Sequence, residues 1–279
     1  MSFSKCFKAS IFACSAAFTT AARIDDRNSG LRADDQNHAA AFVQSAMAPD
    51  TKEEMSVFDA ARLGRPDILQ LLYERDPDII NKIDDFDNST VAHLAAAFGH
   101  LNVLKWIGQQ KECAHLISAK DEDGQTIAHR AARMGKLEVL QWIELKYAQL
   151  LSVKDDDGQT PVHLAARRGK VEVLQLICKR KDAAQLLIVE DNRGQTVAHH
   201  AARTGQLDVL QFLYNNGVDV FSVKNRDGKT PCDLAGRKRF FKRKDGVHKW
   251  LIEENNKRIS QASNVLLEEG KMPDVLVDY

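Results

Sequence analysis

The stretch TPVHLAARRG, residues Thr160–Gly169, decides the fold because close variants of it recur along the chain. Six copies are found, and the steps between equivalent positions are 35, 36, 34, 36 and 34 residues. One alanine of each motif marks the register: Ala60, Ala95, Ala131, Ala165, Ala201 and Ala235. A unit this short cannot bury its own apolar residues, so the copies must stack on one another. The period therefore predicts a repeat protein.

Each unit predicts two helices followed by a tight turn. Thr160 can cap the first helix, and Pro161 follows at a position where no backbone N–H is needed. Gly169 is expected to end that helix in a left-handed conformation. Apolar residues at helical spacing then predict the second helix, and pairs such as Asp157-Gly158 predict the turns of projecting hairpins.

The motif resembles the ankyrin repeat, whose consensus reads T-P-L-H-x-A-A-x-x-G and continues into an apolar second helix. The resemblance covers residues 54–258. It implies an all-α repeat solenoid of stacked helix-turn-helix ankyrin repeats with short β-hairpin fingers. The family period is near 33 residues, and the extra residues here fall between the second helix and the next hairpin. The resemblance also implies that the motif histidines bond to neighbouring backbone and Thr hydroxyl groups: His93, His129, His163 and His199.

The register divides the chain into three parts. Residues 1–50 are a leader without the repeat pattern, residues 51–258 are the repeat domain, and residues 259–279 are a C-terminal tail. The expected units lie near residues 54–88, 89–124, 125–158, 159–194, 195–228 and 229–258.

Composition and motifs argue against catalysis. The formal net charge of +0 does not indicate nucleic-acid binding. The five cysteines form no C-x-x-C pair. The motif histidines should lie about 8–10 Å apart in stacked helices, too far to share a metal ion. Glycine-rich phosphate loops and G-x-S-x-G motifs are missing from the sequence. We expect a non-enzymatic monomer in the cytoplasm, with no metal, no cofactor and no small-molecule substrate.

A basic position in the repeat suggests where a partner binds. Arginines stand seven places after the Thr position in five units, and one more adjoins them: Arg62, Arg133, Arg167, Arg168, Arg203 and Arg237. In ankyrin proteins this position lies near the concave face, where partners usually bind. Acids are expected at the hairpin tips, and we single out Asp121, Asp123, Asp155 and Asp157. This pattern predicts another protein as the partner, bound on the groove and the hairpin fingers.

The same arginines have a second interpretation. They can pair with the hairpin acids and so stabilise the exposed surface by roughly 0–1 kcal/mol each.

The sixth unit carries a basic insertion. Its cations are Lys238, Arg239, Lys242, Arg243 and Lys244. We expect a cationic loop between two helices. It can be a solvated capping element, a nuclear localisation signal, or a contact for anionic lipid or nucleic acid.

Both chain ends leave alternatives open. Residues 1–22 fit either a cleavable targeting segment or an amphipathic or disordered leader. The tail has Glu268, Glu269 and a Val277 third from the end, which is similar to effectors exported through type IV secretion by intracellular bacteria. Those effectors often contain ankyrin repeats, but a structural cap explains the tail equally well.

Three functions therefore remain open from the sequence. The first is a scaffold or adaptor that binds another protein. The second is a secreted bacterial effector that engages a host protein inside the host cell. The third is membrane or nuclear targeting through the basic loop.

Overall fold

The computed structural model describes residues 55–84, 88–235 and 242–268, and for residues 242–245 and 262–268 it describes the backbone alone. The leader predicted at residues 1–50 and the last residues of the predicted tail lie outside this range. Residues 55–279 form one of two compact units of the chain, and everything below concerns its described residues.

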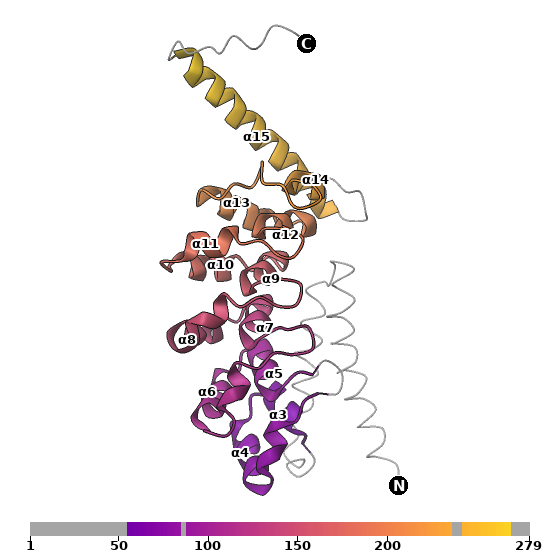
Figure 1. Cartoon of the computed structure of the whole chain (residues 1–279), viewed down its shortest axis with the longest axis vertical. Helices are drawn as coiled ribbons and strands as arrows, with labels where there is room; N and C mark the ends of the chain where they lie inside the picture. Colours follow the sequence, from indigo (N-terminus) through magenta and orange to yellow (C-terminus); the bar gives the residue numbers. More distant parts are fainter. Residues whose placement is uncertain (1–54, 85–87, 236–241, 269–279) are drawn as a thin grey trace. The chain divides into compact units, whose positions relative to one another are not determined.

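The described repeats are pairs of antiparallel helices (Figure 1). Six helices begin with or near the repeated motif: α3 (Val57–Arg62), α5 (Val91–Phe98), α7 (Ile127–Met134), α9 (Pro161–Arg167), α12 (Val197–Thr204) and α14 (Pro231–Ala235). Six helices complete the pairs: α4 (Pro66–Arg75), α6 (Leu101–Gln109), α8 (Leu137–Tyr147), α10 (Val171–Cys178), α13 (Leu207–Asn215) and α15 (Lys242–Glu268). We call the two sets first helices and second helices.

In the first four repeats, the residues after the second helix form a further short helix. These are η1 (Pro77–Asn81), η2 (Ala114–Ile117), η3 (Ala148–Leu151) and α11 (Ala183–Ile188). Each places apolar side chains in the core: Leu150 and Leu151 of η3 are 4% and 1% exposed. The extra length therefore enlarges the core between repeats, at the place predicted from the period.

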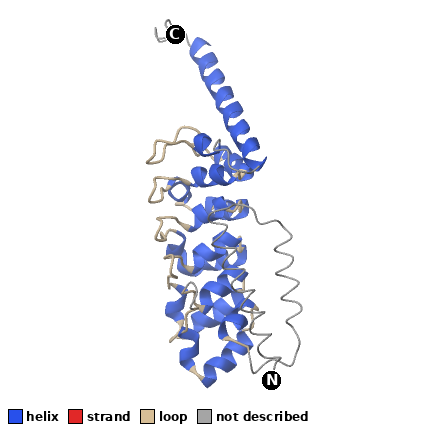
Figure 2. Ribbon diagram, turned by 90° about the vertical axis from the view of Figure 1, so that its right-hand side faces the viewer, coloured by secondary structure: helices blue, strands red, loops and turns tan. Residues whose placement is uncertain are grey.

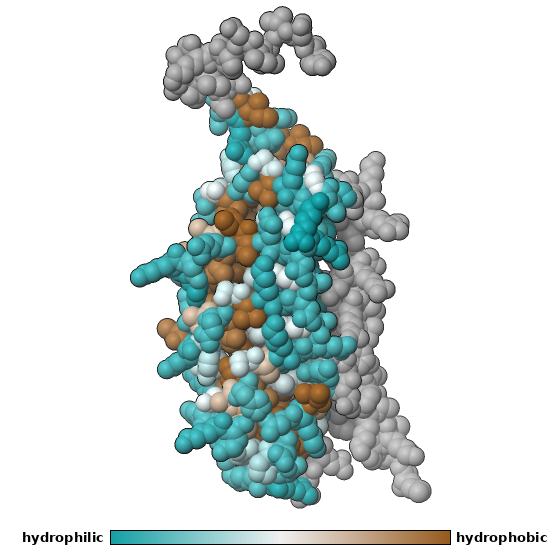
Figure 3. All heavy atoms as spheres, viewed as in Figure 1, coloured by the Kyte–Doolittle hydropathy of each residue, from teal (hydrophilic) through white to brown (hydrophobic). Residues whose placement is uncertain are grey.

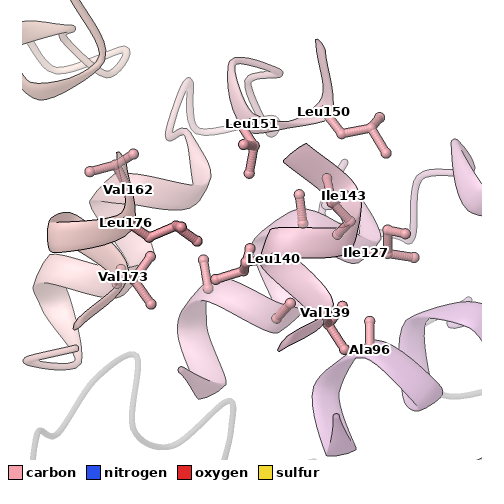
Figure 4. Packing of buried hydrophobic residues seen from close by; sticks show 14 of the residues in the cluster. Ala96, Ile127, Val139, Leu140, Ile143, Leu150, Leu151, Val162, Val173 and Leu176 are labelled. Atoms are coloured by element: carbon pink, nitrogen blue, oxygen red, sulfur yellow. The ribbon is translucent and has the colours of Figure 1, made fainter. Parts of the chain in front are cut away.

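Small side chains allow the first helices to pack closely. The paired alanines of α5, α7, α9 and α12 are fully buried, and neighbouring first helices are in direct contact along the stack. Larger residues of the second helices, such as Leu140 and Ile143, fill the space behind them (Figure 4). Because every unit contributes to the same continuous core, the stacked solenoid predicted from the period is observed.

Glycine ends the first helices for a steric reason. Gly135 caps α7 with φ of 70°, and the N–H of Lys136 returns to the carbonyl of Ala131 at 2.9 Å. A side chain at this φ would be strained, which explains glycine at this place in the motif.

The β-hairpin fingers are not seen among the described residues. One antiparallel bridge occurs there, between Ile83 and Thr90, and the other connections are single tight turns along one edge of the stack (Figure 2). Each turn is closed by bonds of its own, such as that from the N–H of Asp155 to the carbonyl of Gln159 at 2.9 Å. A further bond joins neighbouring loops: the N–H of Asp156 donates to the carbonyl of Asp123 at 3.1 Å.

The sixth unit also differs from the prediction. Lys242, Arg243 and Lys244 belong to the first turn of α15 instead of a loop, while Arg237, Lys238 and Arg239 lie outside the described residues. α15 continues to Glu268, ten residues past the expected domain end at 258. Val247 and Leu251 are 0% and 1% exposed, so this helix is anchored to the stack by its own apolar residues.

Candidate functional site

The motif histidines connect each repeat to the next. In α7, the Nδ1 atom of His129 accepts the backbone N–H of Thr126 at 3.1 Å, which forms a capping box at the helix start. Its Nε2 atom lies 3.1 Å from the carbonyl oxygen of Gln159 in the following loop. This pattern assigns the proton to Nε2. The same contacts recur at His93 and His199. His163 makes the same cap, but its Nε2 atom lies 3.0 Å from the carbonyl oxygen of Val189.

Burial lowers the pKa of His129, His163 and His199 and so favours their neutral form. Burial lowers the pKa of His129 to about 4 and that of His163 to about 3. A second proton on Nδ1 would face the donating N–H of the Thr, so the geometry disfavours the charged form as well. The histidines therefore hold the scaffold and leave no ring nitrogen for a ligand.

Two of the predicted fingertip acids are buried, which corrects the expectation that all four are exposed. Asp121 is 6% exposed, and its Oδ1 atom accepts the N–H groups of Gln125 and Asp123 at 2.8 and 3.1 Å. Asp155 is 8% exposed and accepts the N–H of Gln159 at 2.7 Å. These carboxylates close their own turns, whereas Asp123 and Asp157 are exposed.

The residue after the motif histidine bonds a buried acid in two of the units, and sequence reasoning missed this. Nε of Arg130 donates to Oδ2 of Asp121 at 2.8 Å, and Nε2 of His200 lies 2.9 Å from Oδ2 of Asp191. Burial raises the pKa of Asp191, but the hydrogen bonds from His200 and the backbone outweigh it and lower the pKa to about 2. A polar residue at an otherwise apolar repeat position was the available signal.

The fourth unit lacks this pairing. Its equivalent position holds Leu164, which is 1% exposed. Burial consequently raises the pKa of Asp155 to about 6. The charged form of Asp155 is therefore less stabilised by its surroundings than that of Asp121 or Asp191.

The arginines of the repeated basic position are not equivalent. Arg62 bonds Asp59 and Asp84, both at 3.1 Å, and the Asp84 contact is the loop pairing that the second interpretation predicts. Arg133 is 7% exposed, so it does not present the exposed cation that we expected, because the close packing of α7 covers it. Arg237 lies outside the described residues.

Three partly exposed arginines remain, and they lie in adjacent units. Arg167 and Arg168 follow one another at the end of α9, and Arg203 lies near the end of α12. Arg203 donates to Nδ1 of His200 at 3.2 Å. Burial lowers the pKa of Arg168. We call Arg167, Arg168 and Arg203 the arginine cluster.

The described residues can be searched for metal-ligand groups and for membrane-spanning helices. Within these ranges, no three His, Cys, Asp or Glu side chains are grouped to hold a metal ion. A helix long and apolar enough to cross a bilayer is likewise missing from the described part of the chain.

Comparison with known proteins identifies the family. The family model described as ankyrin repeats (3 copies) matches residues 57–150 and 144–224, which together are more than half of the chain. The chain belongs to the ankyrin repeat family. Repeats of this family generally serve as non-enzymatic protein-binding modules, so the coarse functional assignment is to protein binding. No curated protein matches the ankyrin chain.

Solved structures support the fold. One similar chain occurs in the structure of the Bd0816 predatory endopeptidase from Bdellovibrio bacteriovorus in complex with immunity protein Bd3460. It is 22% identical with a TM-score of 0.50, and the alignment covers 65% of the ankyrin chain and 90% of the other. Because 504 chains match, this similarity identifies a common fold and no particular function.

Proposed function

We propose that this ankyrin protein is an adaptor that binds another protein on the face formed by its first helices and loops. The arginine cluster is the observation that carries this proposal. The cluster places three partly exposed cations in two neighbouring repeats. An acidic segment of a partner would be complementary to their charge.

The neighbouring loops contribute charges of the opposite sign. Asp123, Asp156 and Asp157 are exposed on the two loops that precede the arginine cluster. A partner of mixed charge, with acids facing the cluster and bases facing these loops, therefore suits the surface best. Such a distribution would fix the direction in which the partner lies along the stack.

The test is capture of partners from the native cell type with the full chain. Arg168→Glu should deplete the captured protein, while Lys179→Glu serves as the control. Lys179 is exposed next to α10 in the same repeat, so it undergoes the same charge change on another surface. Equal capture by both variants, with unchanged melting temperatures, would refute binding at the arginine cluster.

The effector and targeting hypotheses stay proposals with less support. The effector hypothesis rests on residues 269–279, which lie outside the described range. The targeting hypothesis rests partly on Lys242–Lys244, which open a helix and not a loop. Translocation assays with the last 20 residues, and localisation with and without Lys242–Lys244, test them separately.

A further inference from the structure

A row of polar contacts connects a buried acid with the arginine cluster. Nε2 of His200 lies 2.9 Å from Oδ2 of Asp191, and Nδ1 of the same ring lies 3.2 Å from an Nη2 donor of Arg203. Asp191 and His200 are 5% and 1% exposed, whereas Arg203 is partly exposed. The imidazole therefore lies between a buried carboxylate and a guanidinium that reaches the surface.

Both neighbours require the same form of the imidazole. An ionised carboxylate only accepts hydrogen bonds, so Nε2 of His200 carries the proton and donates to Asp191. A guanidinium only donates, so Nδ1 is unprotonated and accepts from Arg203. Burial lowers the pKa of His200 to about 4, which agrees with this neutral form. The ring of His163 packs edge-on against that of His200, with the ring centres 5.2 Å apart, and restricts its rotation.

The first unit shows the effect of a charged residue at the same place. Asp59 and Arg62 occupy the positions of His200 and Arg203, and their Oδ1 and Nη1 atoms lie 3.1 Å apart. The carboxylate of Asp59 offsets the charge of Arg62 directly. A neutral imidazole instead accepts from Arg203 without adding a negative charge of its own. It restricts the guanidinium and preserves the attraction of Arg203 for an anion.

We propose that His200 is a positioning residue, which holds the guanidinium of Arg203 ready to bind a carboxylate of the partner, while Asp191 fixes the tautomer and orientation of the imidazole. This inference rests on the proposed function, because it assigns a role within the arginine cluster. Ordering a long side chain before binding reduces the entropy lost on binding. The surface over α12 is mostly hydrophilic (Figure 3), which suits recognition by charge.

The next repeat supplies substitutions that should keep the fold. Leu234 and Asn225 occupy the places of His200 and Asp191 one repeat further on, and both are buried. His200→Leu combined with Asp191→Asn therefore copies a pair that the stack already accommodates, and it removes the Nδ1 acceptor. His200→Leu alone copies the pair found in the fourth unit and is the second variant if the double change impairs folding.

¹⁵N NMR of the free chain measures the contact itself. The ring nitrogens of His200 should show the shifts of the Nε2–H tautomer. Rotation of the Arg203 guanidinium should be slower in the unchanged chain than in the double variant, because the imidazole holds one of its N–H groups. Equal rotation in the two chains would overturn the proposal.

Binding of a fluorescently labelled hexaglutamate peptide at low salt tests the role. The double variant should bind it about 2- to 12-fold more weakly, which is the cost of ordering one long side chain. When Arg203→Gln is already present, the same double change should have no further effect, since His200 acts through Arg203. Equal losses with and without Arg203→Gln would indicate a general structural effect and overturn the proposal.

Arg168→Glu distinguishes the two levels of the argument, with Lys179→Glu as its control for net charge. Weaker binding by Arg168→Glu but unchanged binding by the double variant would mean that the cluster binds acids and that the role of His200 is wrong. If the unchanged chain does not bind the peptide, or if Arg168→Glu binds it equally well, the proposed function fails at this surface and the role of His200 fails with it.

Discussion

At the residue scale, the buried loop acids differ in the side chains that lie beside them. Asp121 and Asp191 have a cation or an imidazole beside them, and Asp155 has Leu164 at that place. One side chain in each repeat thus decides whether a buried carboxylate is stabilised. A single substitution in the loop before the fourth unit should therefore improve stability.

We predict that Asp155→Asn stabilises the protein at neutral pH. The folded-state pKa of about 6 lies above the ordinary 3.8, so the charged carboxylate costs stability as pH rises through this window. Removing the charge should contribute about 1–3 kcal/mol at pH 7 and nothing at pH 4. Asn225 closes the next-but-one turn with its Oδ1 in the same way.

Chemical denaturation at the two pH values measures this effect. Asp191→Asn is the control, because the pKa of Asp191 is lowered to about 2 and its charged form is stabilised. It should destabilise the protein at pH 7. Destabilisation by both variants at neutral pH would show that the charged carboxylate of Asp155 stabilises the fold, contrary to the prediction.

The motif histidines predict loss of stability in mild acid. The folded-state pKa values of His129, His163 and His199 are lowered, to about 4 for His129, so below pH 6.5 the unfolded chain takes up protons that the folded chain does not. Each such histidine costs about 1.4 kcal/mol per pH unit until its folded-state pKa is reached. Denaturation midpoints between pH 7 and 4.5 should fall, and less steeply in His129→Gln. An equal slope in the two chains would disprove the neutral-histidine account.

The sequence was a good guide to residues whose role repeats, and a poor one to residues whose role depends on a neighbour. Gly135 and the motif histidines follow from the repeat alone, because each unit presents them with the same surroundings. Burial of Asp121 and Arg133 depends on a variable position or on packing between units. Both residues were therefore expected on the exposed binding surface.

At the element scale, the short helices after the second helices are part of the core. Leu151 of η3 is 1% exposed, so Leu151→Ala should cost about 2–5 kcal/mol. The same truncation at Leu145, which is 82% exposed, should change the free energy of unfolding by less than about 0.5 kcal/mol. Urea denaturation of the two variants provides the comparison. Similar small effects at both sites would mean that η3 is a surface connection.

The structure of the loops could be predicted only in part from the repeat period. Asp-Gly pairs correctly indicated turns, but hairpin strands were expected within each loop. The observed bonds between loops, as from Asp156 to Asp123, arise only when repeats stack. No single repeat contains that information.

At the scale of the stack, each unit depends on its neighbours. Leu174 of α10 is fully buried, and α10 contacts both α8 and α13. Leu174→Ala should therefore speed amide exchange in α8 and α13 more than in α4, because stability in a repeat stack is shared mainly between adjacent units. Hydrogen exchange followed by mass spectrometry resolves these helices. Uniform acceleration through α4 would instead indicate one indivisible folding unit.

The central claim is that the first helices and loops around the arginine cluster bind a partner protein. Hydrogen exchange of the chain with its captured partner tests it directly. Exchange should slow in residues 152–168 and 188–203, and should stay unchanged in α6 and α8 on the second-helix side. Slowing confined to the second helices, with residues 152–168 unaffected, would contradict the claim.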